Sequence, residues 1–273
     1  MDSPDVTTTM RNVLLRIAYD GTDFFGWQIQ PQRPTIQGTI AAAIEKITDE
    51  AVNLCGSGRT DAGVHAVAQA ANVHLRSPIP CPNLLRALNR LLPESIRILL
   101  ADPVPESFHA RHDASAKTYL YRIFRPPTCP PLLSRFVTPY PYPLDEDAMI
   151  QAAGYFQGTL DFRSFASADG EEGSLDKSCV RTVFRSSLVR DGEELRYTVE
   201  GSGFLHHMVR NIVGTLIDVG RGRTPASAMP RIIAACRRTE AGPTAPARGL
   251  HLLSVSYPPE KLAMIPAPAP SGQ

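Results

Sequence analysis

The sequence has 273 residues, 43% of them hydrophobic, and its 28 basic and 27 acidic side chains leave a formal net charge of +1. This composition is typical of a soluble globular protein with one large domain or two small ones. No apolar run approaches the roughly 20 residues that span a bilayer, and the stretch 1–10 is too polar for a signal peptide. We therefore expect a cytoplasmic protein with no membrane partner.

The cysteines and histidines argue against a metal centre. The five cysteines are scattered without a C-x-x-C pair, which fits reduced, packed thiols, and no H-E-x-x-H pattern is present. We predict no metal. Only four of the 28 basic residues are lysines, and arginine suits bidentate phosphate contacts, although a GC-rich genome gives the same bias.

In the first half of the chain, strands and helices are expected in the order βαββαβ. Alternating residues predict the first strand, and isoleucines at helical spacing predict the first helix. The expected elements are a strand at Val13 to Tyr19, a helix at Thr35 to Asp49, a hairpin of Ala51 to Cys55 with Val67 to Leu75, a helix at Pro82 to Leu92 and a strand at Ser95 to Ala101.

The second half repeats this order. The expected elements are a strand at Lys117 to Phe124, a helix at Asp145 to Phe156, a hairpin of Val180 to Val189 with Glu194 to Glu200, a helix at His206 to Val219, a helix from Thr224 through Arg237 and a strand at Gly249 to Tyr257. The repeat predicts an α+β fold of two split-βαβ, ferredoxin-like lobes sharing a mixed, mainly antiparallel sheet, with a central cleft. We expect lobes at 11–112 and 113–260, and disordered tails at 1–10 and 261–273.

A glycine-rich loop from Gly56 to Ala66 carries a single carboxylate, Asp61, which is the only acid between Glu50 and Glu94. Glycines let the backbone adopt positive φ and let a ligand approach closely, so the loop is a candidate active site. The alternative is that Asp61 only caps a turn, as aspartate often does. The glycine spacing fits neither a Walker loop nor a dinucleotide fingerprint.

Motifs along the whole chain, from about Arg11 to Tyr257, support a more specific interpretation. They are Tyr19 to Thr22 with Phe25 to Gln28, Thr35 to Gly38, Gly58 to Ala66 with Gln69, Phe108 to Arg111, Lys117 to Tyr121, Asp161-Phe162 with Ser164-Phe165, Gly203 to Gly214, and Ala241 to Pro246 with Gly249-Leu250. In these motifs and their order the chain resembles the tRNA pseudouridine synthase A family.

The resemblance implies the pseudouridine synthase fold and an isomerase that converts uridine to pseudouridine at positions 38, 39 and 40 of the tRNA anticodon arm. It also implies a homodimer that uses no cofactor or metal. The reaction must break the bond from C1′ to N1, turn the uracil within its pocket and join C5 to C1′.

The resemblance gives Asp61 the role of nucleophile. Its carboxylate could attack C1′ or C6, or stabilise positive charge at C1′, and the sequence does not choose among these. The family motif makes Arg210 the ion-pair partner of Asp61, whereas a solvated surface arginine is the alternative. Tyr119 is expected to stack on the target uracil and could accept the C5 proton, although ordinary packing in a strand is the alternative.

Several further residues are candidates for contacts with tRNA. Arg59 could fill the space of a flipped nucleotide or grip a phosphate, with a purely loop-bracing role as the alternative. His65 and Gln69 are expected to support the loop. The candidates for salt-dependent phosphate contacts are His109, Arg111, Lys117, Arg210, Arg221 and Arg223.

Two other functions compete with the isomerase. Split-βαβ folds often bind RNA without reacting with it, so a catalytically silent RNA-binding protein is one rival, although the aromatic RNP1 pattern is missing. A nucleoside hydrolase is the other, because an aspartate nucleophile followed by water would release the base.

Overall fold

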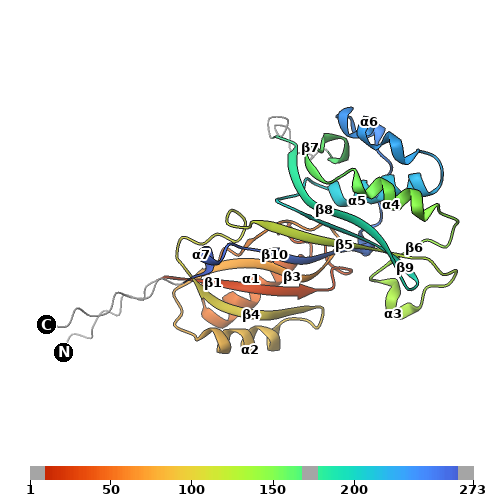
Figure 1. The fold of residues 1–273 in the computed structure, drawn as a ribbon. Helices are drawn as coiled ribbons and strands as arrows, with labels where there is room; N and C mark the ends of the chain where they lie inside the picture. The colour runs from red at the N-terminus through yellow and green to blue at the C-terminus, as the bar shows by residue number, and fades with distance from the viewer. Residues whose placement is uncertain (1–9, 168–177, 264–273) are drawn as a thin grey trace, which may run out of the picture. The chain divides into compact units, whose positions relative to one another are not determined.

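The computed structural model describes residues 10–167 and 178–263 (Figure 1). The stretches 1–9 and 264–273, where we expected most of the disordered tails, lie outside the described residues. The described chain divides into two compact units. The first comprises residues 10–60, 66–115 and 255–263, and the second comprises 61–65, 116–167 and 178–254.

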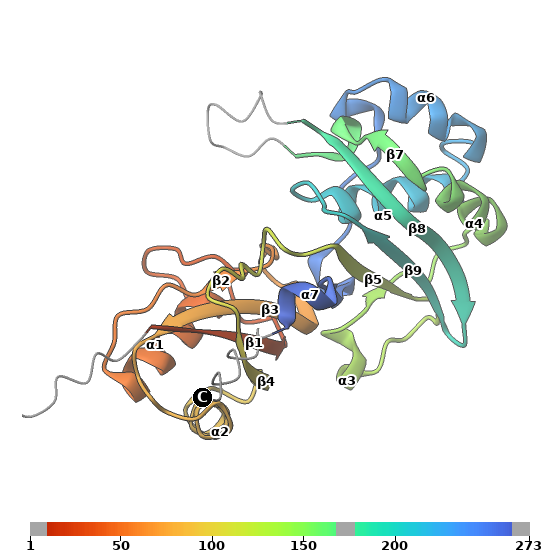
Figure 2. The same ribbon diagram turned by 60° about the vertical axis from the view of Figure 1, so that its left-hand side comes forward.

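The first unit is built on strand β1 (Arg11–Tyr19), which pairs antiparallel with β3 (His65–Leu75) on one side and with β4 (Ile96–Val104) on the other. The short strand β2 (Cys55–Gly56) also pairs with β3. Helices α1 (Ile36–Thr48) and α2 (Cys81–Leu91) cover one face of this sheet, and α7 (Pro259–Leu262) ends the described chain (Figure 2).

The core of the first unit forms where the strand and helix periodicities meet. Alternate residues of β1 are completely buried, and so are residues of α1 at spacings of four. These residues are Val13, Leu15, Ile17, Ile36, Ile40 and Ile44. Thr35 begins α1, because its side chain accepts a hydrogen bond from the Gly38 amide, and Asp49 ends it in the left-handed conformation.

In the second unit, β5, β9, β8 and β7 pair successively as antiparallel neighbours. Strand β10 lies beside β5, and β6 pairs parallel with β5. The bounds are β5 (Ala116–Phe124), β6 (Thr138–Pro139), β7 (Gly158–Asp161), β8 (Val180–Asp191), β9 (Glu194–Gly201) and β10 (Leu250–Ser256). The expected α+β class with mixed, mainly antiparallel pairing is thus confirmed.

Of the helices of the second unit, α4 and α5 pack against each other on one face of the strands, and α3 lies apart from them (Figure 1). Helix α5 contributes most to the core beneath these helices, because a buried apolar stripe runs along it. The stripe consists of Met208, Ile212, Val213 and Leu216. The helices are α3 (Pro131–Ser134), α4 (Glu146–Gly154), α5 (Met208–Gly220) and α6 (Met229–Ala234), with single 3-10 turns at Arg163–Phe165, Ala226–Ala228, Arg238–Glu240 and Ala247–Gly249. No helix in the described ranges is long and apolar enough to cross a bilayer.

Three expected elements were wrong in extent. The helix expected from His206 begins at Met208, because His207 has φ of 59° and cannot join it. The helix expected from Thr224 through Arg237 is broken into a 3-10 turn and α6, and Cys236, at φ of 49°, prevents its continuation. The strand expected at Ala51 to Cys55 is reduced to the two residues of β2, Cys55–Gly56.

Candidate active site

The first part of the glycine-rich loop is anchored within the first unit. At Gly56 a Cβ atom would lie 2.5 Å from the indole of Trp27, so only glycine fits there. The Ser57 hydroxyl donates to Oε1 of Gln69 (2.8 Å), while Nε2 of Gln69 donates to the Gly58 carbonyl (2.9 Å). Gln69 therefore supports the loop, and holds it in a fixed turn.

The segment Asp61–His65 belongs to the second unit. Gly63 takes φ of 76°, which closes a turn in which the Val64 amide donates to the Asp61 carbonyl. His65 is buried and stacks on His251 of β10, with ring centroids 4.9 Å apart. Its Nε2 also lies 2.9 Å from the Arg135 carbonyl. These contacts give His65 a structural role.

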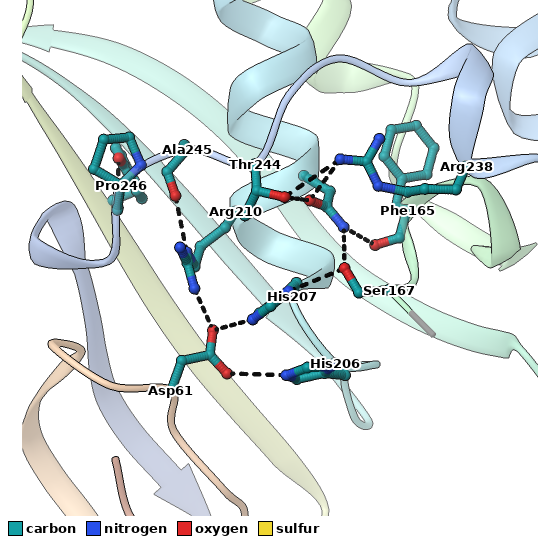
Figure 3. A network of polar contacts seen from close by, with 12 residues as sticks. Asp61, Phe165, Ser167, His206, His207, Arg210, Arg238, Thr244, Ala245 and Pro246 are labelled. Carbon is teal, nitrogen blue, oxygen red and sulfur yellow. Dashed lines mark hydrogen bonds and ion pairs between the residues drawn. The ribbon is translucent and has the colours of Figure 1, made fainter. Parts of the chain in front are cut away.

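The Asp61 carboxylate is surrounded by cationic and polar side chains of the second unit (Figure 3). Nη1 of Arg210 donates to Oδ2 of Asp61 at 2.7 Å. Nε2 of His207 lies 3.4 Å from the same oxygen, and Nε2 of His206 lies 3.6 Å from Oδ1. The Asp61 side chain is 21% exposed, so it is partly shielded from water and remains accessible to a substrate.

Arg210 lies off the buried stripe of α5, yet its side chain is only 15% exposed. Its Nε donates to the Ala245 carbonyl (2.8 Å), and the Ala245 amide donates to the Arg210 carbonyl (3.1 Å). The guanidinium is thus fixed at two points, on the chain segment after α6 and on Asp61. Such a fork balances the charge of a carboxylate and restricts its orientation.

The two histidines beside Asp61 were not assigned a role from the sequence. Their rings stack with centroids 3.8 Å apart and planes at 30°. With Asp61 they bring three potential metal ligands within 4.8 Å of one another. However, Nη1 of Arg210 already donates to Oδ2 at 2.7 Å, and a guanidinium beside that oxygen would repel a bound cation. The geometry therefore suits hydrogen bonding to a carboxylate better than metal ligation.

Tyr119 and Tyr121 of β5 differ in their surroundings. Tyr119 is 7% exposed, and its ring meets Phe204 edge to face at 5.1 Å. Tyr121 is fully buried, and its hydroxyl lies 2.7 Å from Oγ1 of Thr138 and donates to the Pro246 carbonyl (2.8 Å). Burial raises the pKa of Tyr121 well above its usual value, so this phenol stays protonated and structural.

The remaining predicted residues lie at partly or fully exposed positions. Arg59 is exposed, and its Nε donates to Oε1 of Gln28 at 3.2 Å. The ring of His109 lies 4.2 Å from that of His112, and burial and this neighbour lower the pKa of His109. Arg111 is exposed, and Lys117 on β5 is half-buried. The structure thus brings Asp61 and Arg210 into direct contact, whereas Arg59, His109 and Arg111 belong to the first unit.

A family model described as tRNA pseudouridine synthase matches residues 16–113 and 152–258, which is more than half of the chain. The chain belongs to this pseudouridine synthase family. It is 49% identical over 249 residues to "tRNA pseudouridine synthase A" of Solibacter usitatus, an alignment that covers 91% of this chain and all of that protein. The proteins of the same name from Caldicellulosiruptor bescii and Brevibacillus brevis are 48% and 44% identical over 248 residues, with the same coverage.

Among solved structures, the archaeal box H/ACA sRNP Nop10-Cbf5 complex gives a match at 13% identity and a TM-score of 0.34. The match covers 75% of this chain and 43% of that chain. As a pseudouridine synthase, this chain is an isomerase that converts uridine to pseudouridine in tRNA.

Proposed function

We propose that the enzyme acts on uridines 38, 39 and 40 of the anticodon arm and that Asp61 is its nucleophile. The observation that carries the assignment is the ion pair between Asp61 and Arg210, which are held 2.7 Å apart although they are separated by 149 positions in the sequence. A carboxylate that only capped a turn would not need a guanidinium fixed at two points beside it.

The reaction balances as an isomerisation. When a carboxylate oxygen bonds to C1′, the bond from C1′ to N1 breaks and uracil leaves as an anion, which then turns within the site. C5 bonds to C1′ as the carboxylate leaves, C5 loses its proton, and N1 gains one. Addition of Asp61 to C6 is the alternative first step, and both routes return a free carboxylate. Neither consumes a cofactor.

Arg210 has two functions in this proposal. It balances the negative charge of the resting carboxylate, and it restricts the carboxylate to an orientation that suits attack. Its second contact, to the Ala245 carbonyl, prevents the guanidinium from following Asp61 toward the substrate. We further propose that Tyr119 stacks on the uracil. Its edge-to-face contact with Phe204 supports this role, because it holds the plane of the phenol ring.

Asp61 is tested with an unmodified tRNA transcript that carries uridines at 38 to 40. Wild-type protein should form pseudouridine there, and Asp61→Ala and Asp61→Asn should form none while still binding tRNA. Asp191→Asn, at the exposed end of β8, serves as the matched control and should remain active. Persistent isomerisation by Asp61→Asn would exclude the nucleophile. Free uracil would indicate the hydrolase, and tight binding without product from wild type would indicate the silent RNA-binding protein.

Tyr119→Phe separates stacking from proton transfer. The variant keeps the aromatic face, so a fully active Tyr119→Phe together with an inactive Tyr119→Ala supports stacking. Accumulation of an intermediate with a cleaved glycosidic bond in Tyr119→Phe would instead make the phenol the base that takes the C5 proton. Tyr155→Phe, at the end of α4, controls for loss of a hydroxyl elsewhere in the unit.

Arg59, His109, Arg111 and Lys117 are proposed to contact the tRNA backbone. If Arg111 binds one phosphate, Arg111→Gln should weaken binding about equally for all tRNA sequences and reduce the slope of log K against log salt by about 1. For Arg59 the two proposed contacts, with a phosphate or with the space of the flipped nucleotide, differ in outcome. The first lowers affinity, whereas the second lowers the rate at saturating tRNA.

The resemblance also supports a homodimer in which one subunit holds the body of the tRNA while the other carries out the reaction. Light scattering during size-exclusion chromatography gives the mass directly, and a monomer that is fully active at nanomolar concentration would contradict the proposal. A tRNA substrate also makes the cytoplasm the proposed site of action.

A further inference from the structure

His207 occupies an unusual position beside Asp61. It precedes the first turn of α5 with φ of 59°, a left-handed conformation that non-glycine residues adopt rarely. This backbone conformation directs the imidazole between Asp61 and Ser167 (Figure 3). Nδ1 lies 3.0 Å from Oγ of Ser167, and Nε2 lies 3.4 Å from Oδ2 of Asp61.

A buried amide fixes the direction of the hydrogen bonds behind this histidine. Oδ1 of Asn211 accepts from Oγ1 of Thr244 (2.7 Å) and from Nη2 of Arg238 (3.1 Å). Both groups are donors toward that atom, so the amide cannot be flipped without placing NH₂ against a guanidinium. Nδ2 of Asn211 therefore faces the Phe165 carbonyl (2.7 Å) and Oγ of Ser167 (3.5 Å). Asn211 is completely buried, and this orientation satisfies both of its polar atoms.

The orientation of Asn211 favours one tautomer of His207. Nδ2 of Asn211 points an N–H at Oγ of Ser167 and takes up one of the two lone pairs of that oxygen, which favours donation of the Ser167 hydroxyl proton to Nδ1 of His207. An Nδ1 that accepts leaves the proton of a neutral imidazole on Nε2. Nε2 lies 3.4 Å from Oδ2 of Asp61. In this tautomer Asn211 donates toward Ser167, Ser167 donates toward His207, and the Nε2–H of His207 is the group nearest Oδ2 after Arg210.

We propose that His207 is a positioning residue for the isomerisation: its Nε2–H tautomer, fixed by Ser167 and Asn211, holds Oδ2 of Asp61 together with Arg210, so that Oδ1 is the oxygen that attacks. This inference rests on the proposed role of Asp61 as nucleophile. Oδ1 faces His206 at 3.6 Å, which is beyond hydrogen-bond distance, and the His206 side chain is 40% exposed. Arg210 donates to Oδ2, and Nε2 of His207 lies 3.4 Å from the same oxygen, whereas no described residue donates a hydrogen bond to Oδ1, so the two oxygens of the carboxylate differ in their surroundings.

The kinetic test compares two substitutions that differ in reach. In His207→Gln the side-chain amide extends to about the position of Nε2 and can donate to Asp61, whereas in His207→Asn it is too short. Asparagine tolerates the left-handed backbone better than glutamine does. If His207 had only a structural role, the asparagine variant would be the more stable and the more active of the two. Our proposal predicts instead that the glutamine variant has the higher rate.

The rate is measured in single turnover with saturating enzyme, and tRNA affinity is measured separately. We expect His207→Asn to lose on the order of 10- to 100-fold in rate, the range seen when the hydrogen-bond partner of a metal-ligating side chain is removed. Its affinity for tRNA should stay close to that of wild type, and His207→Gln should regain most of the rate. His74→Gln on β3 is the matched control. Equal rates for the two His207 variants would overturn the proposal.

The tautomer itself is read without any substrate. Long-range ¹H–¹⁵N spectra of the full-length protein with ¹⁵N-histidine should show His207 protonated at Nε2, with its signals assigned from their loss in His207→Gln. Ser167→Ala should shift the population toward the other tautomer. If His207 is protonated at Nδ1 in the wild-type protein, the proposed positioning role is refuted, whatever the activity. If Asp61→Asn is active, the proposed function is refuted, and the result for the tautomer is unaffected.

Discussion

The stacked pair His65 and His251 at the base of the Asp61 loop makes a sharp prediction about pH. Burial lowers the pKa of His251 to about 4, and its contact with the Phe136 carbonyl offsets part of this effect. Among the charged neighbours, His65 and Arg122 lower the pKa further and Glu194 raises it. His251 is therefore neutral in the folded protein over most of the accessible pH range.

The sign and size of the effect follow from linkage. In the unfolded chain His251 has its ordinary pKa of 6.5. Below that pH the unfolded state therefore binds a proton at His251 that the folded state does not bind. Stability is thus intact above about pH 6.5 and falls progressively as the pH decreases to about 4. A difference of about 2.5 pKa units corresponds to a loss of about 3 kcal/mol from this group at pH 4.

His251→Gln tests this prediction, because glutamine can still donate to the Phe136 carbonyl but does not titrate. Urea unfolding of wild type and variant from pH 7.5 to 4 gives the difference in their free energies of unfolding at each pH. That difference should shift in favour of the variant by about 3 kcal/mol across the range. His251→Phe should show the same trend from a lower starting stability. A difference that stays constant with pH would refute the reasoning.

Two further predictions concern the packing behind the site. In Gly214→Ala the new Cβ would lie 1.6 Å from the Pro243 carbonyl oxygen, so we expect a loss of about 1 to 3 kcal/mol in thermal unfolding and a lower isomerisation rate. Unchanged stability would mean that the segment around Pro243 can move away from the new Cβ atom without a cost in free energy. In Tyr121→Phe the contacts to Thr138 and Pro246 are lost, so urea unfolding should show a loss of about 1 to 3 kcal/mol, and a neutral result would contradict a structural role for this hydroxyl.

Elements with a strong local pattern were predictable from the sequence. The isoleucines of α1 repeat at helical spacing and are buried as expected, and Thr35 caps the helix that it was expected to begin. The Asp61 loop was also recognisable, because small residues and a single acid between two strands are a local signal. In each case neighbours within a few positions determine the structure.

The features that sequence reasoning missed depend on contacts between distant residues. The periodicity of α5 placed Arg210 off the apolar stripe but could not show what it faces, and its pairing with Asp61 was expected from resemblance alone. His207 lies in the motif Gly203 to Gly214 but was given no role, since its ring is positioned by a left-handed backbone and by Ser167, 40 positions away. The break before Cys236 likewise depends on a single φ value that no composition rule predicts.

The long sequence separation between Asp61 and Arg210 also has a consequence for synthesis. The two residues are 149 positions apart, and at about 5 to 20 residues per second a ribosome needs roughly 7 to 30 s to reach the arginine after the aspartate has been added. During that interval Asp61 has been added to the growing chain and Arg210 has not. The charge-balanced centre can form only after 210 of the 273 residues have been joined, so shorter translation products lack it.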